Sequence, residues 1–167
     1  MQLVEKAPYQ ALYAPDGALE RLAYDGSGDG RAEVVTFFGP GGKAVRAEID
    51  SDDDGRIDRW ETYADSTLVR LGTSRSGRPR PDAWVATDAS GNVARREFDD
   101  DGDGRVDRAE DLRGLAVWAE EFDTDQDGRL DRRVVYGPKG SVESVQRDED
   151  GDGVFERSPT LNAGPGT

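Results

Sequence analysis

The sequence contains no cysteine and no histidine among its 167 residues. The missing cysteines exclude disulfide bonds, thiolate metal sites and cysteine nucleophiles. The missing histidines remove the commonest general base and the usual zinc ligand. Transition-metal sites are therefore disfavoured, since their preferred nitrogen and sulfur side-chain ligands are absent.

Positive charge and long apolar runs are also scarce. The chain has 22 Lys and Arg against 36 Asp and Glu, a net charge of −14. This balance argues against binding to nucleic acid or to anionic membrane surfaces. No run of 18 apolar residues is present, so no transmembrane helix is expected. The start, Met1 to Lys6, lacks the apolar region of a signal peptide. The protein is then either cytosolic or exported by a segment absent from this numbering.

Hydrophobic residues make up only 34% of the chain, and charged residues make up 35%. Such a composition borders on that of disordered chains. The aromatic residues nevertheless recur at fixed offsets, which indicates a folded repeat protein. The 21 glycines and 8 prolines favour many turns.

Five acidic segments of nine residues align without gaps. They are 25–33, 50–58, 99–107, 123–131 and 148–156. Their first residues are separated by 25, 49, 24 and 25 positions, and the value of 49 corresponds to two periods. A degenerate copy, Gly72 to Arg80, fills the gap. Six units of about 25 residues therefore cover almost the whole chain.

Each unit has a second landmark, a turn with glycine between apolar residues. These turns lie within 13–19, 38–45, 87–93, 112–115 and 136–142. A unit reads as strand, glycine turn, strand and acidic loop, and two strands of about 6 residues fit in it. The sequence predicts an all-β antiparallel meander of about 12 strands, either an elongated twisted sheet or an open barrel, with the acidic loops along one edge.

We expect one β-repeat domain over residues 8–157. Residues 1–7 are predicted to form an N-terminal extension, and residues 158–167 a C-terminal tail. The strands do not alternate cleanly: Ile57, Arg59, Glu61 and Tyr63 share one face, with charge in the middle. Either cross-strand Arg–Glu pairs or a partner-facing surface would explain this pattern.

The acidic segments follow the pattern Asp-x-Asp-x-Asp-Gly, with carboxylates at positions 1, 3 and 5. Calcium prefers 6 to 8 oxygen ligands, and such a loop wraps around it, with glycine at position 6 for the sharp turn and a backbone carbonyl at position 7. Magnesium fits less well because it keeps several waters. The sequence thus predicts up to five calcium ions. The candidate ligands at positions 1, 3, 5, 7 and 9 are Asp25, Ser27, Asp29, Arg31, Glu33, Asp50, Asp52, Asp54, Arg56, Asp58, Asp99, Asp101, Asp103, Arg105, Asp107, Asp123, Asp125, Asp127, Arg129, Asp131, Asp148, Asp150, Asp152, Val154 and Glu156.

These loops resemble two families. EF-hands begin in the same way but need a glutamate at position 12, whereas the β-hairpin loops of integrin-type β-propellers carry an acid at position 9. Position 12 is Thr36, Glu61, Glu110, Val134 and Pro159, so two of the five loops have the glutamate. Position 9 is acidic in all five. The resemblance therefore favours β-hairpin calcium loops, and EF-hands are the alternative. The chain also looks like bacterial proteins built from calcium-loop hairpin repeats.

The predicted function is non-catalytic. The segment Gly39 to Lys43 lacks the spacing of a phosphate-binding loop, and the calcium pattern accounts for every close carboxylate pair. We expect a calcium-binding structural or protein-interaction module, periplasmic or secreted, with a protein partner. One version is an extrinsic periplasmic subunit of a membrane protein complex. The alternatives are a calcium-dependent adhesion or carbohydrate-binding module, an EF-hand-like protein, and a hydrolase using Asp or Glu.

The degenerate loop lacks carboxylates at its first, third and fifth positions and carries Arg75, Arg78 and Arg80 instead. Three interpretations are open. The arginines replace a missing ion by relieving repulsion along the acidic edge, they dock an acidic partner, or they are solvated residues of a decayed repeat.

Overall fold

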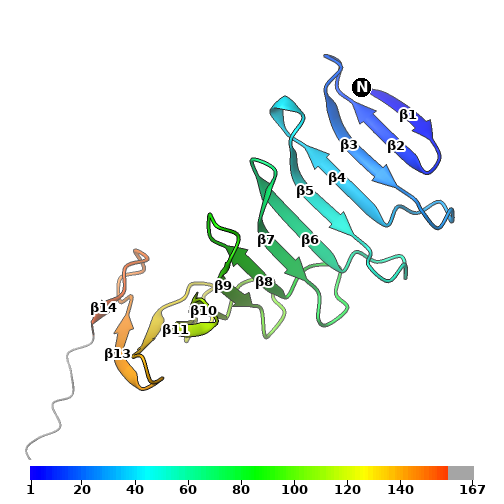
Figure 1. Ribbon diagram of the computed structural model, residues 1–167. Coiled ribbons are helices and arrows are strands. Elements are labelled where there is room, and N and C mark those ends of the chain that lie inside the picture. The colour runs from blue at the N-terminus through cyan, green and yellow to red at the C-terminus, as the bar shows by residue number, and fades with distance from the viewer. Residues whose placement is uncertain (158–167) are drawn as a thin grey trace, which may run out of the picture. The chain divides into compact units, whose positions relative to one another are not determined.

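The computed structural model describes residues 1–157, and its described part is built almost entirely of β-strands (Figure 1). The strands are β1 (Gln2–Lys6), β2 (Tyr9–Tyr13), β3 (Leu19–Tyr24), β4 (Val34–Phe38), β5 (Ala44–Ile49), β6 (Arg59–Ala64), β7 (Thr67–Thr73), β8 (Ala83–Thr87), β9 (Val93–Phe98), β10 (Arg108–Arg113), β11 (Ala116–Phe122), β12 (Arg132–Tyr136), β13 (Val142–Arg147) and β14 (Glu156–Arg157). A short 3₁₀ turn, η1 (Pro40–Gly42), lies between β4 and β5. The predicted all-β antiparallel meander is confirmed.

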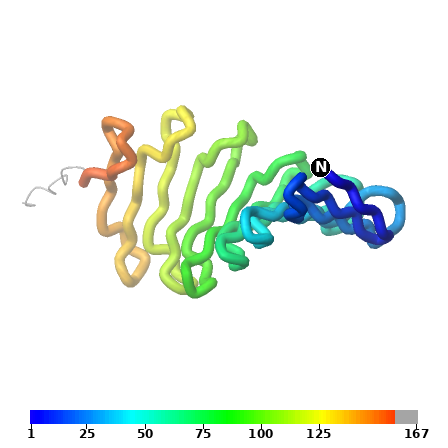
Figure 2. Tube along the Cα trace, turned by 90° about the horizontal axis from the view of Figure 1, so that it is seen from above, coloured from blue at the N-terminus to red at the C-terminus, as the bar shows by residue number. Residues whose placement is uncertain are grey.

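The chain divides into two compact units, and each is described by itself. Unit 1 is Met1–Val93 and unit 2 begins at Ala94. In unit 1, strands β1 to β8 pair antiparallel in the order of the chain. In unit 2, β9 to β14 do the same. Figure 2 shows these strands as successive hairpins of one trace.

The fourteen strands exceed the predicted twelve because both ends of the meander add one. β1 lies within residues 1–7, which we predicted to be an extension, and it pairs with β2 over all five of its residues. The two-residue β14 pairs with β13. The predicted tail, 158–167, lies outside the described residues. The predicted domain of residues 8–157 spans parts of both compact units.

The glycine turns form hairpins as predicted. In four of them the first turn residue donates its backbone N–H to the carbonyl four residues later, as in Ala14 to Ala18 at 2.8 Å. The sequence analysis missed the hairpin between β6 and β7. Its two turn residues, Asp65 and Ser66, both have positive φ, at 49° and 67°. Tight hairpins require this conformation, and asparagine and glycine are its usual signal.

Burial in the sheet is confined to a few side chains, most of them small. Within the described residues the buried hydrophobic set is Ala23, Ala47, Ala109, Leu112, Ala119 and Val134, and no large side chain is fully buried. Such a set is expected for a single-layered sheet, in which no second layer covers the strands. Stability must therefore come from cross-strand pairs and from the loops as well as from apolar burial.

Charged side chains in the strand centres pair with one another. In unit 2, Arg95 forms ion pairs with Glu97, Asp111 and Glu121 at 2.7–3.0 Å, across β9, β10 and β11. Arg133 on β12 extends the network to Asp111 and Glu121. Burial alone would lower the pKa of Arg95, but its hydrogen bonds with Glu121 and Asp111 outweigh burial and raise that pKa. The structure thus contains cross-strand pairs of arginine with glutamate and aspartate, the first of the two explanations that the pattern left open.

Candidate metal centres

The acidic loops connect consecutive hairpins at one edge of each unit. Backbone hydrogen bonds stack neighbouring loops in one register. The position 1 N–H of one loop donates to the position 9 carbonyl of the preceding loop, as in Asp50 to Glu33 at 2.8 Å and Asp148 to Asp131 at 3.0 Å. Equivalent positions of these neighbouring loops therefore lie next to one another along the edge of the sheet.

Each of the five predicted loops gathers three carboxylates whose oxygens lie within 4.8 Å of one another. Oxygens bound to one calcium ion at about 2.3–2.6 Å lie no farther apart than about twice that distance, so this spacing fits the ion. The clusters are Asp25, Asp29 and Glu33; Asp50, Asp52 and Asp54; Asp99, Asp101 and Asp107; Asp123, Asp125 and Asp127; and Asp148, Asp150 and Asp152.

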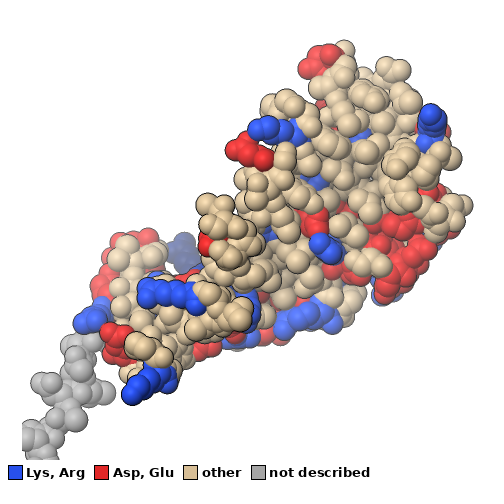
Figure 3. All heavy atoms as spheres, viewed as in Figure 1, with Lys and Arg blue, Asp and Glu red and all other residues tan. Residues whose placement is uncertain are grey.

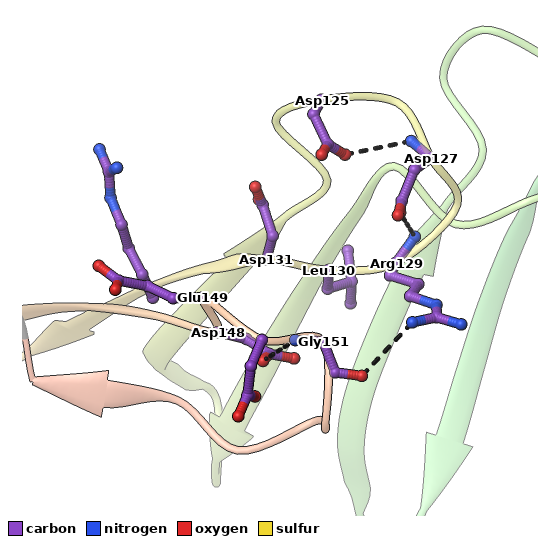
Figure 4. Close-up of a pocket in the computed structure, with 10 residues that line it drawn as sticks. Asp125, Asp127, Arg129, Leu130, Asp131, Asp148, Glu149 and Gly151 are labelled. Atoms are coloured by element: carbon purple, nitrogen blue, oxygen red, sulfur yellow. Dashed lines mark hydrogen bonds between the residues drawn. The ribbon is translucent and has the colours of Figure 1, made fainter.

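Backbone amides shape each loop around its position 1 carboxylate. In loop 123–131 the two Asp123 oxygens accept the N–H groups of Gln126 and Gly128, both at 2.8 Å. Asp125 and Asp127 accept the N–H groups two residues after them (Figure 4). These bonds hold the side chains of positions 1, 3 and 5 on the inside of one turn.

The position 9 acid accepts backbone N–H groups from the start of its loop, from positions 2 and 3 in two acidic loops and from position 2 in two others. Glu33 accepts from Gly26 at 2.6 Å and from Ser27 at 3.0 Å. These hydrogen bonds, with that of Gly26 the strongest, lower the pKa of Glu33 to about 2. Asp107 forms the same pair of bonds with Asp100 and Asp101. The structure therefore assigns position 9 a backbone role, in addition to the predicted ligand role.

The degenerate loop starts two residues later than the sequence alignment placed it. Ser74 N–H donates to the Asp58 carbonyl at 3.0 Å, as a position 1 residue does. Asp82 N–H donates to the carbonyl of Thr73, the bond that position 9 makes elsewhere. The loop is therefore Ser74 to Asp82 rather than Gly72 to Arg80. The spacing from Asp50 to Ser74 is then 24 residues and that from Ser74 to Asp99 is 25, as between the other loops.

Asp82 retains the position 9 role in this loop. Its carboxylate accepts the N–H groups of Arg75 and Ser76 at 2.8 and 2.9 Å. Burial raises the pKa of Asp82, but the hydrogen bonds from Ser76 and Arg75 together outweigh burial and lower that pKa to about 2. The sequence analysis missed Asp82 because the alignment was shifted by two residues.

Two arginines of this loop take different positions. Arg75 pairs with Asp82 at 3.3 Å within its own loop. Arg78, at position 5, lines a cavity of about 160 Å³ together with Asp52, Asp54 and Asp58 of the preceding loop. A cation thus lines a cavity shared with a neighbouring acidic loop, and the three interpretations of these arginines stay predictions.

One carboxylate outside the pattern was also missed. Asp53, at position 4 of its loop, has a φ of 58°, whereas the other acidic loops have Gly or Gln there. Burial and the nearby charges of Glu33 and Asp29 raise the pKa of Asp53. The negative charges of the first loop therefore act on the Asp53 carboxylate. The first loop itself carries Ser27 in place of a carboxylate at position 3.

The EF-hand alternative is wrong for this chain. Strands, not helices, flank the loops of the described residues. The position 12 glutamates lie on strands and bind side chains there: Glu61 pairs with Arg59 and Tyr63, and Glu110 with Arg108 at 2.7 Å. Burial and the hydrogen bond to Glu61 raise the pKa of Tyr63 to about 12. These glutamates are thus engaged on the sheet.

No family model matches the chain, and no curated protein matches it. A crystal structure of accessory secretory proteins 1, 2 and 3 from Streptococcus pneumoniae is similar over 65% of this chain, with 13% identity and a TM-score of 0.44. The Gap123 glycosylation-associated complex of Streptococcus agalactiae is similar over 75%, with 15% identity and a TM-score of 0.38. The chain spans about a fifth of the length of each of these matched chains.

In the described part of the chain, no helix reaches the length and apolar character needed to cross a membrane.

Proposed function

We propose that the protein is a non-catalytic, calcium-binding β-repeat module that serves as a structural or protein-interaction subunit. The observation that carries this proposal is that each of five loops gathers three carboxylates, drawn in every case from positions 1, 3, 5 and 9. The sixth loop keeps the same backbone path without those carboxylates, so the loop shape does not by itself require the acids. The acids then need a separate explanation, and a hard cation supplies it.

The charge of the loops supports an ion as a stabilising ligand. Asp and Glu side chains at positions 1, 3, 5 and 9 number 19 of the 36 acids in the chain, and they crowd one edge of each unit. Figure 3 shows red carboxylates gathered at the loop edge of the strands in unit 1. Five calcium ions would change the net charge from −14 to −4 and relieve this repulsion.

The exposed apolar side chains of the single-layered sheets support a role in protein interaction. Aromatic and apolar side chains of the strands are half-exposed, and ten large hydrophobic residues of the described chain are exposed. A protein partner would cover such surfaces. Loops of this kind in extracellular modules bind calcium at about 10⁻⁴–10⁻³ M, which favours a periplasmic or secreted location.

Calorimetric titration with calcium tests the proposal, with magnesium as the matched control cation. We expect about five calcium ions per chain and much weaker binding of magnesium. Asp125→Asn is the matched variant, because it keeps the side-chain size and removes one loop carboxylate. It should lose one ion. A flat calcium titration up to 10 mM, on the order of ten times the weakest expected Kd, would contradict the proposal.

A second candidate function, carbohydrate binding, rests on one observation. A cavity of about 430 Å³ in unit 2 is lined by Trp118, Tyr136 and Pro138, with Arg113 and Glu143 beside them. Aromatic walls with a few polar groups are typical of small-ligand sites. Glycan-array binding that disappears in Trp118→Ala would favour this candidate over a purely structural role.

A further inference from the structure

The side chain at position 7 of an acidic loop reaches the next loop along the edge. Arg105 Nη1 donates to the carbonyl of Asp127 at 2.7 Å. Arg129 Nη1 donates to the carbonyl of Gly151 at 3.4 Å (Figure 4). The sequence analysis considered only the backbone carbonyl of position 7. In the structure the guanidinium of the position 7 arginine also contacts the next loop.

The glycines of the receiving loops fit these arginines closely. A Cβ at Gly128 would collide with the Arg105 side chain, and a Cβ at Gly55 would collide with the guanidinium of Arg31. At Gly151 a Cβ would approach Arg129 Nη1 to 3.1 Å. In three loop pairs an arginine therefore lies against a glycine of the next loop, at position 6 for Gly55 and Gly128 and at position 4 for Gly151.

Arg105 touches its own loop as well as the next one. Its Nε lies 3.9 Å from the carboxylate of Asp103, at position 5, and its backbone N–H donates to Asp103 at 2.7 Å. In the next loop the guanidinium binds a backbone carbonyl, so the carboxylates of that loop stay available to an ion. One side chain thus joins Asp103 of its own loop to a backbone carbonyl of the next loop.

We propose that the position 7 arginines couple the order of each loop to that of its neighbour. Ordering one loop fixes the backbone from which its arginine extends, and this lowers the entropy cost of ordering the next loop. This part of the inference rests on the proposed function: if the loops bind calcium, the same coupling makes calcium binding cooperative. Ions would load as a pair in unit 1, through Arg31, and as a group of three in unit 2, through Arg105 and Arg129.

Hydrogen exchange in the presence of chelator tests the coupling without calcium. In Arg105→Gln, amides of residues 123–131 should exchange about five-fold faster or more, and those of 99–107 should also exchange faster, because coupling between two loops is reciprocal. In Arg129→Gln the affected pair of loops should be 123–131 and 148–156. Arg132→Gln is the control, because it removes the same charge from an exposed strand position. Unchanged exchange in the following loop, or equally faster exchange throughout unit 2, would overturn the proposal.

Calcium titration of the same variants separates this proposal from the proposed function. We expect Arg105→Gln to keep the wild-type number of ions and lose the steepness of the binding curve. A wild-type curve fitted by independent sites would overturn the cooperative loading. If no calcium binds at all, the proposed function fails, and the exchange experiment alone still decides whether the arginines couple the loops.

Discussion

The loop from Ser74 to Asp82 and the acidic loops share a backbone but not a set of charges. Both kinds place the position 1 N–H on the preceding loop and close with an acid at position 9. Four of the acidic loops add carboxylates at positions 1, 3 and 5, and the first loop adds them at positions 1 and 5, whereas this loop has Ser74, Ser76 and Arg78 there. The comparison teaches that the position 9 acid closes the turn with or without the other acids, and that the acids at positions 1, 3 and 5 serve something else, which we propose is calcium binding.

The largest expected effect comes from removing calcium, which should act on the acidic loops alone. A ligand that binds only the folded state stabilises by about 2.7 kcal/mol per site at 100 times its Kd. Several sites together would rival the ~5–15 kcal/mol of a whole domain. We therefore expect chelator to lower the Tm by about 10 °C or more. Superimposable melting curves with and without chelator would contradict the claim that the acidic loops, unlike the loop from Ser74 to Asp82, hold stabilising calcium.

The next effect tests whether charge is all that the degenerate loop lacks. A variant with Ser74→Asp, Ser76→Asp, Arg78→Asp and Pro79→Gly restores the pattern on a backbone that already has the right register. We expect calorimetry to detect one more calcium ion than in the wild type. The control adds Pro79→Gly alone and should bind no extra ion. An unchanged stoichiometry would mean that the two kinds of loop differ in more than charge.

Position 9 should separate the two kinds of loop by their response to calcium. Asp82→Ala removes the charged acceptor of the Arg75 and Ser76 N–H groups, so it should destabilise unit 1 by about 1–3 kcal/mol, equally with and without calcium. Asp131→Ala should also weaken calcium binding at one site. Urea unfolding with and without calcium measures both. A calcium-dependent loss in Asp82→Ala would contradict the assignment.

The smallest effect is a pH dependence. The pKa of Asp82 is about 2 in the folded chain against an ordinary value of 3.8. Between these values the unfolded chain binds more protons than the folded chain, so stability rises with pH. The contribution of Asp82 is therefore complete above about pH 4 and is lost as the pH falls toward 2. The free energy of unfolding should therefore fall less between pH 5 and pH 2 in Asp82→Asn than in the wild type, as measured by urea unfolding at each pH.

Much of the fold could be predicted because its signals are local and repeated. The glycine turns and the acidic pattern each occupy fewer than ten residues, so the period, the hairpins and the meander follow from the sequence. The hairpin at Asp65 and Ser66 was missed because these residues are not the usual ones for positive φ. β1 was missed because its partner strand, rather than its own composition, makes it part of the sheet.

The sequence by itself determined the repeat, the all-β class and the carboxylates that recur in five loops, because each depends on neighbours along the chain. The tertiary structure decided the register of the degenerate loop, the role of Asp82 and the reach of the arginines to the next loop. These features depend on hydrogen bonds between residues of different loops, and the pairing of whole strands sets which residues meet. Spacing along the sequence could not resolve a shift of two residues in a loop that had lost three of its four acids.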